Sequence, residues 1–531
     1  MYLKKMIKKQ KLAFYLFILI YIVVGIYLSI TTGITSDESF EQMNWEENIS
    51  GIESLLNYGH YDNFLEYLDK YHGIAFHYIS QPIQYLTSNL VSNLNEVSDY
   101  GGLLMSKHSV VFIIFSISGI FFYKLIIRIT NSNSFSILST FLYLLYPYLF
   151  GHSLFNMKDI PFLSIWLITT YYSLDVIEDI YLEKKIEYKK LFIVSFLAAY
   201  LISIRILGVL IFFQVLISLI ILFNIKNIKF KSFFKDNYKN FLIFLSLLVL
   251  FVYLMNPILW LNPYEFINSI KYMGDYFNDI CTLTLGDCMD SLNLPSSYFF
   301  IWLFFKLPIL IILGVIIFPL VEKKIFENNI NSIYYGTLCF SVLGIIFIFI
   351  LFSVNIYDEI RHIMFLLPLI FLIGLTNLFY FNKKFSYILS VLTIIFFSLE
   401  NISLNPYQYT WLNSFAKFTK IQKNFEIDYW GVSGKNLSQK ISEYTKRNNL
   451  SNDICIYGDE FAKDYLIKHG FTCFKRYQQL DSAKVKPALA YKNLRNAKRS
   501  NPRDCNLIWD ETYNYTFTKD KISVGTVWLC D

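Results

Sequence analysis

The sequence predicts an all-α polytopic membrane protein with about eleven transmembrane helices and a small C-terminal α/β domain outside the membrane. Of its 531 residues, 55% are hydrophobic and only 17% are charged, whereas an ordinary soluble domain has about 25% charged residues. The apolar residues stand in blocks close to the roughly 20 residues that a helix needs to span a bilayer. These blocks end near residue 400, which divides the chain into a transmembrane domain (1–400) and a polar domain (401–531).

The first predicted span covers residues 12–30 and follows five lysines between positions 4 and 11. Its apolar run is long and no small-residue cleavage site follows it, so we expect an uncleaved helix rather than a signal peptide. Residues 31–107 then form a long loop, in which 52–68 and 79–94 have the amphipathic pattern of helices lying on a membrane surface. The further spans are predicted at 108–127, 134–150, 160–177, 191–204, 206–224, 240–259, 297–320, 333–353, 362–380 and 386–400.

Lysine and arginine are distributed unevenly between the two sets of connections. When the N-terminus is placed in the cytoplasm, the inner connections hold the basic clusters: Arg128, residues 184–190 and 226–239, Lys323 with Lys324, and Lys383 with Lys384. The outer connections of the membrane domain carry few basic residues, as the positive-inside rule predicts. The rule also accounts for the net charge of +6 without a nucleic-acid partner. We therefore expect a multi-pass plasma (inner) membrane protein with an extracytoplasmic C-terminus.

The polar C-terminal region has the pattern of a small α/β domain. "NDICIYG" and "FTCFKRY" read as strands, and "DEFAKDYLIKHG" between them reads as a helix that ends at a glycine. Cys505 and Cys530 bracket a predicted hairpin, so we expect them to pair in an oxidising compartment, with a gain of roughly 3 kcal/mol by the chain-entropy estimate.

Ionisable residues of the membrane domain gather at one predicted depth, the outer membrane–water boundary. Taken singly, an acidic pair after a helix is usually a solvated turn, and a lysine such as Lys158 usually snorkels to the headgroups. Arg205 lies between two apolar runs, where burial of its charge costs roughly 2.5 kcal/mol or more. These residues together indicate a functional site more strongly than any one of them does alone. Its members are Asp37 with Glu38, Lys158 with Asp159, Arg205, and Asp358, Glu359, Arg361 and His362.

Acids opposite cations at this depth fit one kind of chemistry. A carboxylate at a helix end can take a proton from a hydroxyl group, and cations can hold a phosphate and stabilise it as a leaving group. A site at the edge of the bilayer suits a substrate that is itself a lipid. The pattern therefore indicates transfer of a sugar from a lipid phosphate to an acceptor outside.

Short motifs at these positions resemble the GT-C class of integral membrane glycosyltransferases, in particular the branch with protein O-mannosyltransferases and the lipid A aminoarabinose transferase. "SDESFEQ" is similar to the first-loop Asp-Glu motif of that class. The likeness runs from Ser36 to about Gly431 and includes "FNMKDIPF", "LPSSYFFIWLFFKLP", "YDEIRH", "NPYQYTWLN" and "FEIDYWG". The resemblance implies a phospholipid-carrier-dependent transferase that moves a hexose or pentose from a polyprenyl-phosphate donor with inversion, with the first-loop acid as base.

We assign the candidate site residues by role. Asp37 is the expected base and Glu38 supports it or positions the sugar, although two adjacent acids leave that ranking open. The expected ligands of the donor phosphate are Lys158, Arg205, Arg361 and His362, and the expected substrate contacts are Asp159, Asn156 and His72. A monophosphate donor needs no metal, because cationic side chains can carry its charge; a divalent ion at Asp37, Glu38 or His362 is the alternative.

The sequence does not decide whether the sugar acceptor is a glycan, a lipid or a protein. Residues beyond 431 do not resemble the sugar-binding modules of eukaryotic protein mannosyltransferases, which argues against a protein acceptor. The rival class is a lipid or polysaccharide transporter or flippase of the cell envelope. Its polar path would need ionisable residues within the spans, and the span interiors here are nearly free of charge. A structural assembly protein would explain the external domain but not the clustered charges.

Overall fold

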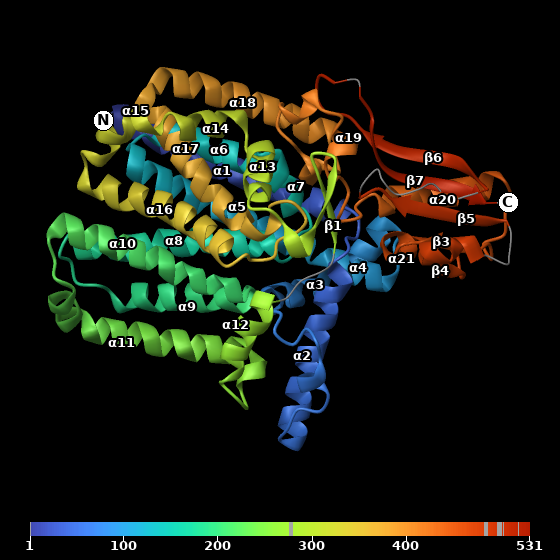
Figure 1. The fold of residues 1–531 in the computed structure, drawn as a ribbon, viewed down its shortest axis with the longest axis horizontal. Helices are drawn as coiled ribbons and strands as arrows, with labels where there is room; N and C mark the ends of the chain where they lie inside the picture. The colour runs from blue at the N-terminus through green and yellow to red at the C-terminus, as the bar shows by residue number, and fades with distance from the viewer. Residues whose placement is uncertain are drawn as a thin grey trace.

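A bundle of long helices carries a small sheet domain at one end (Figure 1). This computed structural model describes residues 2–275, 280–482, 487–495, 502, 504–518 and 520–530. The start of helix α1 (Tyr2–Thr31) lies at the end of the bundle opposite the sheet domain (Figure 1). The mainly helical fold with a C-terminal sheet confirms the predicted fold class.

Eight helices within the described ranges are long and apolar enough to cross a membrane, and two bent helix pairs raise this number to ten. One predicted span, at 191–204, is not among these ten; it corresponds to α9 (Tyr188–Ile204), a helix of 17 residues. The count of eleven therefore stays a prediction. The unbent candidates are α1, α4–α5 (Asp99–Ser106, His108–Thr130), α8 (Asp159–Tyr181), η2–α10 (Ile206–Leu210, Ile211–Lys226), α11 (Phe230–Met255), α16 (Asn329–Leu351), η5–α17 (Arg361–Leu366, Leu367–Phe381) and α18 (Lys383–Ser403).

Two predicted spans are broken in the structure. The span predicted at 134–150 consists of α6 (Asn133–Leu145) and α7 (Pro147–Ser153), bent by 62°. The span predicted at 297–320 contains α13 (Ser297–Lys306) and α14 (Ile309–Ile316), bent by 119°. Pro147 and Pro308 stand at these breaks, where a proline removes a backbone donor and disfavours helical geometry in the residue before it.

The predicted outer connections gather at the end of the bundle that carries the sheet domain (Figure 1). The long first loop contains α2 (Glu38–Tyr58) and α3 (Ala75–Asn95). Helix α3 matches the amphipathic stretch predicted at 79–94. The stretch predicted at 52–68 is not one helix, because α2 already ends at Tyr58, where Gly59 takes the left-handed conformation (φ 77°) that favours glycine.

The sheet domain contains five strands in the order β4-β3-β5-β7-β6. The strands β3 (Ile456–Gly458), β4 (Phe474–Arg476) and β5 (Ala488–Asn493) are parallel, and β7 (Ile522–Cys530) runs antiparallel to both β5 and β6 (Cys505–Tyr513). Helix α21 (Lys463–Lys468) connects β3 to β4, so the predicted strand–helix–strand unit is confirmed. Helix α20 (Gly434–Arg447) packs its apolar face on this sheet.

The sheet domain is attached to the first loop by direct hydrogen bonds. Lys435 Nζ donates to the Thr31 carbonyl at the end of α1 (2.6 Å) and to Asn95 Oδ1 (2.9 Å). An ammonium at this point also complements the negative end of the helix dipole. The backbone N–H of Ser36 donates to the Trp430 carbonyl (3.0 Å). These contacts fix the short segment between α1 and α2.

Six of the seven cysteines form disulfides, all in segments predicted to lie outside. The pair Cys505–Cys530 confirms the predicted pairing, and Cys281–Cys288 and Cys455–Cys473 accompany it. The remaining thiol, Cys339, lies within α16. Disulfides persist in oxidising compartments, so their placement agrees with the predicted orientation.

We expect the C-terminus outside the membrane and the connection around Lys324 inside. A reporter that is active only in the periplasm should be active when fused after Asp531 and inactive when fused after Lys324, because the basic clusters hold their connections in the cytoplasm. The two fusions are compared at equal expression. The reverse pattern would overturn the topology and the outer placement of the cavity described next.

Candidate functional site

A cavity of about 570 Å³ lies where the first loop meets the helix ends that we predict to be extracytoplasmic. Six of the nine predicted site residues line it, from five separate segments of the chain. These six are Asp37, His72, Lys158, Arg205, Arg361 and His362. The rest of the lining is mainly apolar, and this apolar wall consists of Ile204, Ile206, Leu207, Val209, Leu210, Ile270, Met273, Ile348, Phe349 and Val354. The cavity is therefore lined by both ionic and hydrocarbon side chains.

Asp37 is the acid that faces this cavity from the start of α2. Its side chain makes no capping hydrogen bond to the helix and stays 42% exposed. Its Oδ2 lies 3.2 Å from Nη1 of Arg361. Burial within the surrounding protein raises the pKa of Asp37, and the charge of Arg361 only partly offsets that effect. The carboxylate is thus a stronger base than a solvated aspartate, while still accessible from the cavity.

Glu38 points away from the cavity into the protein and does not line it. Its Oε1 accepts hydrogen bonds from the backbone and side chain of Thr35 (2.8 and 2.7 Å) and lies 2.9 Å from Nε2 of His108. The other ring nitrogen of His108 lies 2.9 Å from the carbonyl of Ser29, so both ring nitrogens face an oxygen. Glu38 and His108 form a buried contact that secures the turn before α2.

Lys158 is held at the cavity wall by two partners. Its Nζ lies 2.7 Å from Oε1 of Glu41 and 2.9 Å from Nδ1 of His72. Burial and the neighbouring ammonium lower the pKa of His72 to about 3, so its neutral ring accepts a hydrogen bond from Lys158. Burial alone would raise the pKa of Glu41, but Lys158 and the nearby histidines hold it below its usual range. Glu41 is therefore an anion that orients the ammonium.

Arg205 reaches the cavity with a buried carboxylate behind it. It forms an ion pair with Asp159, which is 2% exposed. Asn156 orients this acid, since its Nδ2 donates to Asp159 Oδ2 (2.9 Å) and its Oδ1 accepts from the Asp159 backbone N–H (2.8 Å). Asn156 and Asp159 do not line the cavity, although we predicted both as substrate contacts. The structure places them as the support of Arg205.

Arg361 is the cation closest to the proposed base. Its Nη1 lies between Asp37 Oδ2 (3.2 Å) and Asp358 Oδ2 (3.3 Å). The guanidinium lies over the rings of Tyr357 and Trp430, 5.1 Å from each centroid, an arrangement that stabilises a cation away from water. His362 lines the cavity beside it and packs against Tyr357. The predicted "YDEIRH" segment thus contributes three residues to the cavity lining, Tyr357, Arg361 and His362.

The predicted alternative of a divalent ion at Asp37, Glu38 or His362 does not fit this geometry. The Glu38 carboxylate is used by Thr35 and His108 and faces away from the cavity. Across the described part of the chain, no three His, Cys, Asp or Glu side chains are grouped as metal ligands.

Some residues of the site had no counterpart in the sequence interpretation. Glu41 follows Asp37 by four residues, the spacing that places two side chains on one helix face. This spacing could have indicated that Glu41 lies near the site. Arg495 forms ion pairs with Asp358, which lies next to Arg361, and with Glu426. Arg495 and Glu426 lie in the polar C-terminal region, where their charges resemble those of a solvated surface.

No protein-family model matches the chain, and no curated protein sequence matches it either. Two crystal structures of ArnT from Cupriavidus metallidurans are similar in the course of the chain. The apo structure is 10% identical, and the likeness covers 91% of this chain and 93% of that one with a TM-score of 0.49. The structure bound to undecaprenyl phosphate is 11% identical, and the likeness covers 97% of each chain with a TM-score of 0.45.

The contrast between the two adjacent acids gives a stability test. Glu38→Gln should lower the thermal stability of the purified protein, because a buried polar group left without a hydrogen-bond partner costs about 1–3 kcal/mol. Asp37→Asn should leave the melting temperature nearly unchanged, since this side chain faces the cavity. Thermal unfolding in detergent, followed by intrinsic fluorescence, compares the two isosteric variants. Equal melting temperatures for both would contradict the structural role of Glu38.

Proposed function

We propose that the protein is a membrane glycosyltransferase that moves a sugar from a polyprenyl-phosphate-linked donor to an acceptor hydroxyl on the outer face of the membrane. The cavity carries this proposal, because its lining has a partner for each end of such a donor. Three cations, Lys158, Arg205 and Arg361, line it together with the residues of the apolar wall. A soluble sugar nucleotide would leave the apolar wall without a partner.

The cations suit the phosphate of the donor. Guanidinium groups match phosphate oxygens in geometry as well as in charge, and an ammonium adds a compact point charge. Lys158 and Arg205 are each oriented by a carboxylate, so little side-chain freedom is lost when the phosphate binds. The apolar wall runs along the start of η2–α10, helix α12 (Glu265–Asp275) and the end of α16, where a prenyl chain can leave toward the membrane.

Asp37 supplies the base in this mechanism. Its carboxylate takes the proton of the acceptor hydroxyl while the acceptor oxygen forms a bond to the anomeric carbon of the sugar. The bond from that carbon to the phosphate oxygen breaks, and the bond electrons leave with the phosphate. The cations stabilise the charge that develops on this leaving group. Attack opposite the leaving phosphate inverts the anomeric centre, and polyprenyl phosphate is the second product.

The proposed base is tested by Asp37→Asn. Asparagine nearly matches aspartate in size but accepts no proton at neutral pH, so turnover should fall by about 10²–10⁴-fold while donor binding is largely kept. The measurement is transfer from a radiolabelled prenyl-phosphate sugar in reconstituted membranes. Glu38→Gln is the matched control, and molecules that stay folded should lose less activity. Full transfer by the Asp37 variant would reject the mechanism, and a larger loss in the Glu38 variant would assign the base to Glu38.

The proposed phosphate site is tested at Arg361 and Arg205. Loss of a charge-assisted contact costs about 1.5–3 kcal/mol, so Arg361→Ala should weaken binding of undecaprenyl phosphate by roughly one to two decades. At the second position Arg205→Ala alone would leave Asp159 buried without its partner. The double variant Arg205→Ala/Asp159→Asn removes the pair together and should weaken binding comparably. Unchanged affinity in folded variants would remove these arginines from the phosphate site.

A further inference from the structure

The segment that presents Arg361 has an unusual backbone. Asp358 and Glu359 are consecutive residues with positive φ angles of 57° and 65°. Outside glycine, each such residue costs of order 1–3 kcal/mol and persists only where its surroundings hold it. This strained turn lies directly before the 3₁₀ helix η5, which begins at Arg361. Whatever holds the turn therefore also fixes the position of Arg361.

One side of the strained turn is held by the bent helix pair. Glu359 is fully buried, and its Oε2 lies 2.7 Å from Nζ of Lys306, the last residue of α13. The Glu359 backbone N–H donates to the hydroxyl of Tyr298 (3.1 Å). Burial raises the pKa of Glu359 to about 7, although Lys306 opposes that effect. The carboxyl group is thus bound inside the protein rather than available to the cavity.

The other side is held by Arg495 of the sheet domain. Its Nη2 forms an ion pair with Oδ1 of Asp358, and its Nε donates to Oε1 of Glu426 (3.0 Å). The second oxygen of Asp358 lies 3.3 Å from Arg361 Nη1. Charged groups therefore alternate in sign from the sheet domain to the proposed base, in the order Arg495, Asp358, Arg361 and Asp37.

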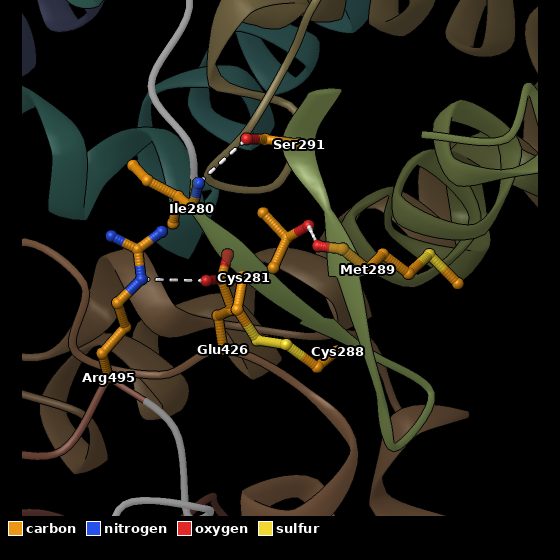
Figure 2. Close-up of a disulfide and its surroundings, with 8 residues drawn as sticks. Ile280, Cys281, Cys288, Met289, Ser291, Glu426 and Arg495 are labelled. Atoms are coloured by element: carbon orange, nitrogen blue, oxygen red, sulfur yellow. Dashed lines mark hydrogen bonds and ion pairs between the residues drawn. A yellow bond between two sulfur atoms is a disulfide. The ribbon is translucent and has the colours of Figure 1, made fainter. Parts of the chain in front are cut away.

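A disulfide-bonded hairpin supports the outer end of this series. Strands β1 (Cys281–Thr284) and β2 (Asp287–Asp290) are joined by the Cys281–Cys288 bond, and the Glu426–Arg495 pair lies beside them (Figure 2). The Glu426 backbone N–H donates to the Leu283 carbonyl (3.2 Å). The hairpin thereby fixes the backbone that carries Glu426, and Glu426 in turn orients Arg495.

We infer that Arg495 is a positioning residue of the proposed active site, through which the sheet domain sets the distance between Arg361 and Asp37. This inference rests on the proposed function. By sharing Asp358, Arg495 limits how strongly that acid draws Arg361 away from the proposed base. Arg495 makes no contact with the cavity and takes no part in the chemistry.

The charges around the turn predict what loss of Arg495 does. The carboxyl groups around the turn are Asp37, Asp358, Glu359 and Glu426, and the cations are Arg361, Arg495 and Lys306. Glu41 and Asp159 also act on Asp37, but each is paired with its own cation, Lys158 or Arg205. Without Arg495, the full charge of Asp358 acts on Arg361, and Asp37 loses part of its cationic partner. Less positive charge beside a carboxylate raises its pKa. The base form of Asp37 then requires a higher pH.

The experiment measures the pH dependence of kcat/KM for Arg495→Met in reconstituted full-length protein. The acid limb should move to higher pH, and kcat/KM at neutral pH should fall about 10–100-fold, as for loss of one charge-assisted contact. Arg495→Lys keeps the charge and should return the limb toward the wild-type position. Arg476→Met, at an exposed arginine on β4 of the same domain, is the matched control and should leave the profile unchanged.

A second variant distinguishes a positioning effect from a loss of folding. Arg495→Met/Glu426→Gln removes the buried pair together, and it should show the same upward shift. Folded variants whose acid limb stays at the wild-type pH would overturn the positioning role, even if their activity is lower. The result is separable from the proposed function: if Asp37→Asn is inactive and the limb does not move, only the role of Arg495 fails, an active Asp37→Asn rejects Asp37 as the base, and wild-type protein without any transfer activity rejects the function itself.

Discussion

The contact between Asp37 and Arg361 is the constraint on which the rest of the site depends. The two residues are 324 positions apart, and each stands on a connection rather than within a long helix. Asp37 is fixed because the segment before it is bound to the sheet domain through Ser36 and Lys435. Arg361 is fixed because the turn before it is bound to the same domain. The sheet domain thus holds the segments that carry both partners.

The cost of burying charge explains why these residues come in pairs. A charged group removed from water without a partner is expensive, and breaking a buried pair costs more than the pair contributes. Lys158 is balanced by Glu41, Arg205 by Asp159, and Arg361 by Asp37 and Asp358. Each cation can therefore stand at the edge of a low-dielectric region before any ligand is bound. The carboxylates also set directions, since Asn156 fixes Asp159 and Asp159 fixes Arg205.

The sequence predicted the membrane bundle, the sheet domain and most residues of the cavity, because those features depend on local signals. Long apolar runs specify helices, and charges are conspicuous where few are expected, as at Arg205 and Arg361. The direction of a side chain is not a local signal. Nothing in "SDESF" shows that Asp37 faces the cavity while Glu38 turns toward His108, which lies 70 residues away. Arg495 was missed for the same reason, since its partners are brought to it only by the tertiary fold.

The pairing of the cations also bears on how the cavity can select its ligand. A neutral headgroup offers the three cations nothing that their carboxylates do not already supply. A phosphate adds acceptor oxygens between them and can be shared by Lys158, Arg205 and Arg361, which all line the same cavity. The apolar wall adds a second requirement, because its burial contributes only when a hydrocarbon chain covers it. The lining thus offers ionic and apolar contacts within one cavity, and a ligand that used both would be anionic and lipidic.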